Sequence, residues 1–121
     1  MANEQEERNK QVVARFFDEV VMGPGDNLDL LDELVAEDYY QRNPHAGQGR
    51  EGLRAFFEKL LPLPARGPET VNLIADGDLV VRQAIREQGM LIDVMRVQDG
   101  MLVEHWDAYR PNPGTERLPG F

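Results

Sequence analysis

Three turn dipeptides in the second half of the chain constrain its fold more than any other feature. Asp76-Gly77, Gln88-Gly89 and Asp99-Gly100 each separate two segments in which apolar and polar residues alternate. Asp-Gly is a strong signal for a two-residue hairpin turn, because both central residues must adopt positive φ. The second half is therefore predicted to form an antiparallel meander. The predicted strands span about residues 69–75, 78–87, 90–98 and 101–110.

The first half of the chain has helical periodicity instead. Apolar residues recur at helical spacing in three segments, each followed by glycine or proline or by a β-like pair of tyrosines. The predicted helices span residues 4–22, 28–38 and 50–61, and a proline-rich stretch at 62–68 separates them from the strands. Helices followed by a meander indicate an α+β fold in which the helices cover one face of a curved sheet. The tail from Pro111 onward is expected to be extended.

The size and charge of the chain limit its domain count and its partners. Its 121 residues are predicted to form one domain, residues 1–121. With 22 acidic against 13 basic residues and a formal net charge of -9, the chain lacks the basic face that nucleic acids and anionic membranes require. The polar, acidic start predicts that no signal peptide precedes the fold, and no apolar run is long enough to span a membrane. We therefore expect a cytoplasmic protein.

Several classes of chemistry lack their residues or their motifs. The chain has no cysteine, which excludes disulfides, thiol nucleophiles and Cys-ligated zinc. It also has no serine, so a Ser nucleophile is excluded. Its two histidines show no recognised ligand spacing such as His-Glu-x-x-His, so neither a metal site nor a cofactor is expected. Gly47, Gly49 and Gly52 lack the Lys and Ser/Thr of a phosphate-binding loop and are interpreted as turn glycines.

Polar residues on the last two predicted strands are the candidates for a functional site. Asp93 stands between apolar neighbours, and alternation sends His105, Asp107 and Tyr109 to one face and Trp106 to the other. A tight turn at residues 99–100 would pair Asp93 with Trp106. A one-residue bulge would instead bring Asp93 beside His105 and Asp107. The pattern alone leaves both registers open.

Two interpretations of these carboxylates also remain open. A carboxylate in an apolar cavity has its charged form destabilised, so its pKa rises, and a second carboxylate nearby raises it further. Such a group is a usable acid or base near neutral pH. In the structural alternative, Asp93 pairs with Arg82, Arg86 or Arg96, and Asp107 lies in water on the outer face. The corresponding structural role for His105 is a surface or merely hydrogen-bonded imidazole.

Three segments carry a resemblance to a known family. They are residues 40–44, residues 49–57, and the strand pair 92–96 with 99–107, which contains Glu104-His105-Trp106-Asp107. These segments resemble the nuclear transport factor 2-like superfamily, and within it the SnoaL-like polyketide cyclases. The resemblance covers almost the whole chain. It implies a cone-shaped α+β barrel with three N-terminal helices packed on a strongly curved antiparallel sheet, an apolar pocket and a homodimer.

The resemblance also implies roles for single residues. In the cyclases the catalytic acid/base corresponds to Asp107, and Asp93 and His105 share the pocket face with it, which favours the bulged register. In the related ketosteroid isomerases the strand aspartate corresponds to Asp93. The other two isomerase positions fall on Phe16 and Asn43, which supply neither the hydroxyl donor nor the basic carboxylate of that reaction.

The leading hypothesis is a cofactor-free cyclase or isomerase that removes a proton next to a carbonyl group of an apolar small molecule. Asp107 is the expected base, and protonated Asp93 or His105 is expected to donate to the enolate oxygen. The expected substrate-binding residues are Phe16, Tyr40, Arg42, Asn43, Phe56, Trp106 and Tyr109.

Two other functions are compatible with the same fold. One is a small-molecule-binding protein without catalysis, in which the carboxylates are salt-bridged. The other is an epoxide hydrolase similar to limonene-epoxide hydrolases, which would place Arg82 or Arg86 between two carboxylates over a water molecule.

Overall fold

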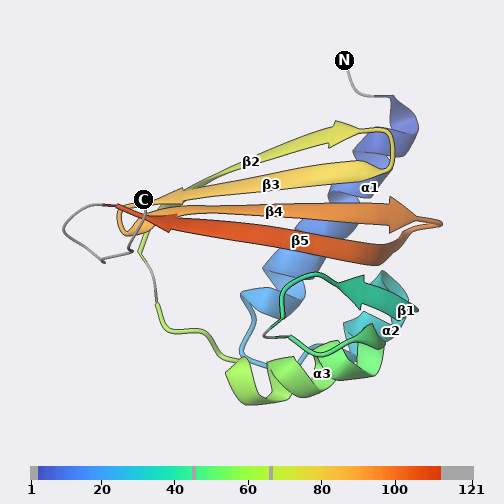
Figure 1. Ribbon diagram of the computed structural model, residues 1–121, viewed down its shortest axis with the longest axis horizontal. Coiled ribbons are helices and arrows are strands. Elements are labelled where there is room, and N and C mark those ends of the chain that lie inside the picture. The colour runs from blue at the N-terminus through green and yellow to red at the C-terminus, as the bar shows by residue number, and fades with distance from the viewer. Residues whose placement is uncertain (1–2, 45, 66, 113–121) are drawn as a thin grey trace.

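The computed structural model describes residues 3–44, 46–65 and 67–112. Its helical segments are α1 (Glu4–Arg15), η1 (Phe16–Val21), η2 (Leu28–Leu30), α2 (Leu31–Leu34) and α3 (Gly49–Leu60). Its strands are β1 (Val35–Gln41), β2 (Glu69–Asp76), β3 (Leu79–Arg86), β4 (Gly89–Gln98) and β5 (Met101–Pro111). The strands form one sheet in the order β1-β5-β4-β3-β2, with α1 crossing one face and α3 lying near β1 (Figure 1).

The structure confirms the α+β class and the four predicted strands. β2 to β5 form the antiparallel meander, and the turn at Asp99 and Gly100 has φ values of 52° and 76°, as the dipeptide predicts. The sheet is mixed rather than wholly antiparallel, because β1 pairs with β5 in parallel. It is also an open sheet with two edges, not a closed barrel. None of the described helices is long and apolar enough to cross a membrane.

The pairing of β4 with β5 decides the register that the sequence left open. Asp93 lies opposite Asp107, and Met95 lies opposite His105. The register shifts where Arg96 faces Glu104 but Val97 faces Leu102, so Val103 is the extra residue of a β-bulge. The bulged register places Asp93, His105 and Asp107 on one face of the sheet.

The first helix runs without a break from Glu4 to Val21. Asn3 caps it with a reciprocal capping box to Glu6, which supplies partners for its first free N–H groups. After Arg15 it continues as a π-helical turn, shown by the bond from the Met22 N–H to the Phe17 carbonyl oxygen at 2.9 Å. Its apolar side packs against the inner face of the sheet. The buried members of that side are Val13, Phe16, Phe17 and Val20.

The second predicted helix is wrong beyond Leu34. It was expected to reach residue 38, but the chain becomes extended at Val35 and forms β1. Val35 pairs with Leu102, and both side chains are fully buried. This contact with a strand far along the chain outweighs local helical periodicity. The expected extended tail lies outside the described residues beyond Asn112.

Candidate functional site

The inner face of the sheet brings three candidate residues together. The Nε2 atom of His105 lies 2.8 Å from Oδ1 of Asp93 and 4.0 Å from Oδ2 of Asp107. Asp93 and His105 are buried, whereas the Asp107 side chain keeps 26% of its surface exposed. Each residue offers one potential ligand atom, and these atoms lie within 4.8 Å of one another. The cluster therefore combines a buried pair with a carboxylate that a ligand can reach.

Gln41 at the end of β1 holds the other side of the imidazole. Parallel pairing places Gln41 directly opposite His105. The Gln41 Oε1 atom accepts hydrogen bonds from the backbone N–H of Asn43 and from Nδ1 of His105, both at 3.0 Å. Because a backbone N–H can only donate, the Gln41 atom at this position is its carbonyl oxygen. It follows that Nδ1 of His105 carries a hydrogen.

This tautomer determines where the remaining protons of the pair lie. With Nδ1 protonated, the 2.8 Å contact between Nε2 and Asp93 Oδ1 requires one proton between these two atoms. Both nitrogens of His105 are then engaged, so the imidazole has no hydrogen left for a substrate. Oδ2 of Asp93 is the one buried side-chain polar atom among the described residues that has no hydrogen-bond partner. An orphaned buried oxygen is unfavourable and marks a position that a ligand can satisfy.

Tyr39 completes this chain of hydrogen bonds. Its hydroxyl oxygen accepts from Gln41 Nε2 at 2.8 Å, and its side chain is buried. Burial, followed by the charges of Asp93 and Asp107, raises the pKa of the Tyr39 hydroxyl well above its usual range. Tyr39 and Gln41 were not among the predicted site residues. Their spacing of two on one strand was the available signal, but the first residues of that strand, 35–38, were mistaken for helix.

The exposed carboxylate of Asp107 is held by the loop that follows β1. The Asn43 amide donates from Nδ2 to Asp107 Oδ2 at 3.1 Å. This loop folds tightly onto α3, since a Cβ atom on Gly52 would lie only 2.7 Å from the carbonyl carbon of Gly47. The two glycines thus let the backbone of this loop approach the first turn of α3 closely.

No arginine among the described residues forms an ion pair with Asp93 or Asp107. Arg96 binds Asp78 and Glu104. Arg82 and Arg86 both bind Glu69 instead. Within the described residues, none of these guanidinium groups lies within ion-pair distance of Asp93 or Asp107. The structural alternative and the epoxide-hydrolase arrangement both required such a contact.

Three of the predicted substrate-binding residues face away from the cluster. Trp106 lies opposite Val94 on the outer face of the sheet. Arg42 binds Glu104 through Nε at 2.9 Å and Nη2 at 2.6 Å, and its guanidinium lies 3.9 Å from the centre of the Tyr40 ring. Arg42 is the principal cause of the lowered pKa of Glu104. Tyr40, Arg42 and Trp106 therefore form a separate surface group.

Of the other predicted residues, Asn43 contacts Asp107 as described above, and Phe16, Phe56 and Tyr109 are aromatic. Phe16 is buried, Phe56 is partly buried, and both pack against Phe57, with ring centres 6.0 and 5.7 Å from it. Tyr109 continues the face of Asp107 toward the end of β5, where its hydroxyl donates to the carbonyl oxygen of Gln88 at 3.4 Å. These aromatic rings provide apolar surface near the polar cluster.

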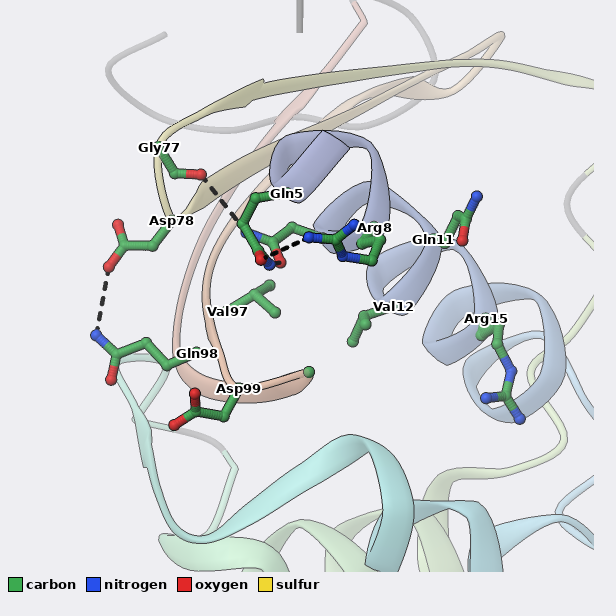
Figure 2. A pocket seen from close by; sticks show the side chains of 12 residues that line it. Gln5, Arg8, Gln11, Val12, Arg15, Gly77, Asp78, Val97, Gln98 and Asp99 are labelled. Atoms are coloured by element: carbon green, nitrogen blue, oxygen red, sulfur yellow. Dashed lines mark hydrogen bonds between the residues drawn. The ribbon is translucent and has the colours of Figure 1, made fainter. Parts of the chain in front are cut away.

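The molecule also has an open cavity of about 740 Å³ at the other end of the sheet. Figure 2 shows Gln5, Arg8 and Val12 of α1 facing the turns that follow β2 and β4. None of the residues of the Asp93–His105–Asp107 cluster lines this cavity. We therefore place the candidate site at the polar cluster rather than at this cavity.

Comparison with known proteins identifies a family model and several similar folds. Residues 13–105 match the model of the SnoaL-like domain. A SnoaL-like polyketide cyclase candidate from Jannaschia sp. CCS1 is 21% identical, with a TM-score of 0.72 and 90% of each chain covered. A polyketide cyclase candidate from Acidithiobacillus ferrooxidans is 19% identical, with a TM-score of 0.62 and coverage of 90% of this chain and 91% of that chain.

A protein with different chemistry has a similar fold. An epoxide hydrolase of the limonene-epoxide-hydrolase-like type from M. tuberculosis is 16% identical, with a TM-score of 0.66 and coverage of 88% of this chain and 85% of that chain. No curated protein sequence matches the chain. Likeness at these identities establishes the fold, so the activity must be argued from the site.

Proposed function

Because the chain belongs to the SnoaL-like domain family, we propose that it is an acid/base enzyme of the polyketide-cyclase type. It removes a proton next to a carbonyl group of a mostly apolar small molecule, and the resulting enolate leads to aldol-type cyclisation or isomerisation. The observation that carries the proposal is the reachable carboxylate of Asp107 beside a buried Asp93–His105 pair with one unsatisfied oxygen.

Asp107 is the proposed general base. Its side chain is partly exposed, and the Asn43 amide fixes the carboxylate at 3.1 Å without neutralising it. A base must reach the proton that it abstracts, and Asp107 is the most accessible of the three residues. Proton transfer from the carbon to a carboxylate oxygen of Asp107 leaves the electron pair on the enolate.

Asp93 is the proposed donor to the enolate oxygen, and His105 is a positioning residue. Both nitrogens of His105 are engaged, by Gln41 and by Asp93. When the shared proton lies on Nε2 of His105 and bonds to Oδ1 of Asp93, a further proton on Oδ2 makes that oxygen the hydrogen-bond donor that the substrate oxygen can meet, and the Asp107 carboxylate, 4.0 Å away, balances the charge of the imidazolium. A donor held in place in a site that excludes water stabilises the developing charge by several kcal/mol relative to water.

The proposal is tested by proton exchange, which requires no knowledge of the natural product. We expect the protein to catalyse deuterium exchange at carbon atoms next to the carbonyl of apolar ketones and 1,3-dicarbonyl compounds in D₂O, followed by NMR. Exchange above the rate of buffer and of heat-denatured protein supports an enolate-forming site. If the protein binds such compounds but never accelerates exchange, the non-catalytic binding function replaces this proposal. Hydrolysis of apolar epoxides without ketone exchange favours the epoxide hydrolase instead.

We also propose that two copies of the chain associate through the outer face of the sheet. No described helix covers this face in Figure 1, and it carries apolar side chains in cross-strand pairs, including Ile74 with Val81 and Val94 with Trp106. Ile74 is 59% exposed and Ile85 is 42% exposed. The net charge of -9 opposes association of like copies, so an apolar contact is the favourable one.

We expect the double variant Ile74→Asp, Ile85→Asp to be a monomer and the unmodified protein to be a dimer. Two carboxylates placed in an apolar contact would have to lose their hydration. Light scattering coupled to size exclusion measures the mass of both. Leu60→Asp, on the exposed side of α3, is the matched control and is expected to stay dimeric. A monomeric unmodified protein, or a dimer that survives the double change, contradicts this interface.

A further inference from the structure

The Asp93–His105–Asp107 cluster also has the composition and geometry of a site for a divalent metal ion. It offers one imidazole nitrogen and two carboxylates, and their potential ligand atoms lie within 4.8 Å of one another. Ligand atoms about 2.0–2.2 Å from a tetrahedral Zn²⁺ lie roughly 3.3–3.6 Å apart. The Nε2 atom of His105 lies 2.8 Å from Asp93 and 4.0 Å from Asp107, so shifts of about half an ångström bring these two distances to such values. The ligand oxygens of Asp93 and Asp107, which lie within 4.8 Å of each other, must also approach one another when the ion binds.

The hydrogen bond from Gln41 prepares the imidazole for a metal ion. Oε1 of Gln41 fixes the hydrogen on Nδ1, so that the lone pair of His105, once the shared proton leaves, lies on Nε2 toward the two carboxylates. Metal-binding histidines typically donate their other N–H to an oxygen in this way. On the opposite side, the Asn43 amide orients Asp107, the second of the carboxylates.

The orphaned oxygen of Asp93 is an independent indication of a ligand. Asp93 is only 3% exposed, and its Oδ2 atom has no hydrogen-bond partner among the described residues. A carboxylate oxygen without a donor is a suitable ligand for a cation. The sequence predicted no metal site because no recognised ligand spacing is present along the chain. The ligands instead come from two paired strands, Asp93 from β4 and His105 and Asp107 from β5, so no single sequence motif contains all three.

We propose that this cluster binds one first-row divalent cation of the Zn²⁺ or Co²⁺ type through His105 Nε2 and the carboxylates of Asp93 and Asp107. One nitrogen and two carboxylate ligands suit these ions, whereas Mg²⁺ prefers six oxygen ligands. The cation takes the place of the proton shared by Asp93 and His105, so binding releases a proton and weakens as the pH falls. The metal-bound state and the acid/base state exclude each other, and the proposal does not rest on the proposed catalytic function.

The test is titration of the EDTA-treated, full-length protein with ZnCl₂ by calorimetry, in two buffers that differ in ionisation enthalpy. We expect one ion per chain, and a difference between the two buffers that reports proton release. CoCl₂ is expected to give visible absorption bands of low-symmetry coordination, and MgCl₂ is not expected to compete. Asp93→Asn, Asp107→Asn and His105→Gln are each expected to weaken Zn²⁺ binding by at least about tenfold. Circular dichroism and thermal unfolding establish that each variant is folded.

The second histidine provides a matched control. The chain has two histidines and no cysteine, so His45→Gln removes the only other strong nitrogen or sulfur side-chain ligand. It is expected to leave the affinity unchanged. Absence of binding at millimolar ZnCl₂, binding that survives all three cluster variants, or binding lost in His45→Gln each overturns the proposal. Deuterium exchange by the EDTA-treated protein is measured separately, so failure of metal binding and failure of the proposed catalysis remain distinguishable. If both hold, ZnCl₂ is expected to inhibit exchange in the unmodified protein.

Discussion

Replacing Asp107 with asparagine is expected to lower the rate of proton exchange next to a carbonyl by about 100-fold or more, the contribution typical of a positioned general base. Asparagine has nearly the same shape, and its side-chain oxygen can still accept from Asn43, which lies 3.1 Å from Asp107 Oδ2. The amide has no basic lone pair that could take the proton from carbon. The measurement is the NMR exchange rate of any ketone that the unmodified protein turns over, at saturating and at low concentration.

The control for Asp107→Asn is Asp99→Asn. Asp99 lies in the turn between β4 and β5 with φ of 52°, a conformation that asparagine tolerates equally well. This change removes the same charge from the same hairpin without altering the cluster. We expect it to leave both the exchange rate and the thermal midpoint nearly unchanged. Full activity in Asp107→Asn, or an equal loss in Asp99→Asn, would remove Asp107 from its proposed role.

The strands were predictable because their signals are local. Asp99-Gly100 favours a turn through its own backbone preference. The alternation of apolar and polar residues on either side predicts strands without information about a distant partner. The same locality explains why Asp93, His105 and Asp107 could be selected as candidates before their contacts were known. Each is a polar residue on the face that should be buried.

Two features depended on distant contacts and were not predictable in this way. β1 pairs in parallel with β5, and parallel strands are not joined by a short turn whose sequence could predict the pairing. The helical interpretation of residues 35–38 therefore obscured the strand that carries Tyr39 and Gln41. The bulge at Val103 is likewise a choice between two registers that the local alternation permits equally. These two features turn the separate candidates into one hydrogen-bonded cluster.

Removing the polar atoms of Gln41 is expected to have the largest effect on stability in the cluster. Gln41→Met keeps the approximate shape of the side chain but leaves the Asn43 N–H and the His105 Nδ1–H without their shared acceptor, and the Tyr39 hydroxyl without its donor. Each buried polar group left without a partner costs about 1–3 kcal/mol. We expect the free energy of unfolding in urea to fall by about 2–5 kcal/mol.

A second measurement separates the role of Gln41 in positioning from its role in stability. If the Gln41 oxygen fixes the hydrogen on Nδ1, then ¹⁵N-histidine NMR of a His45→Gln background shows His105 with Nδ1 protonated when Gln41 is present. We expect Gln41→Met to give a mixture of tautomers and to lose exchange activity under conditions in which the variant is still folded. Gln41→Glu keeps an acceptor for both donors and should preserve the Nδ1 hydrogen. The donor role of Asp93 was inferred from the hydrogen on Nδ1 of His105, which in turn was inferred from the Gln41 oxygen. If His105 keeps the same tautomer in Gln41→Met, the Gln41 oxygen does not fix that hydrogen, and this proton arrangement is contradicted.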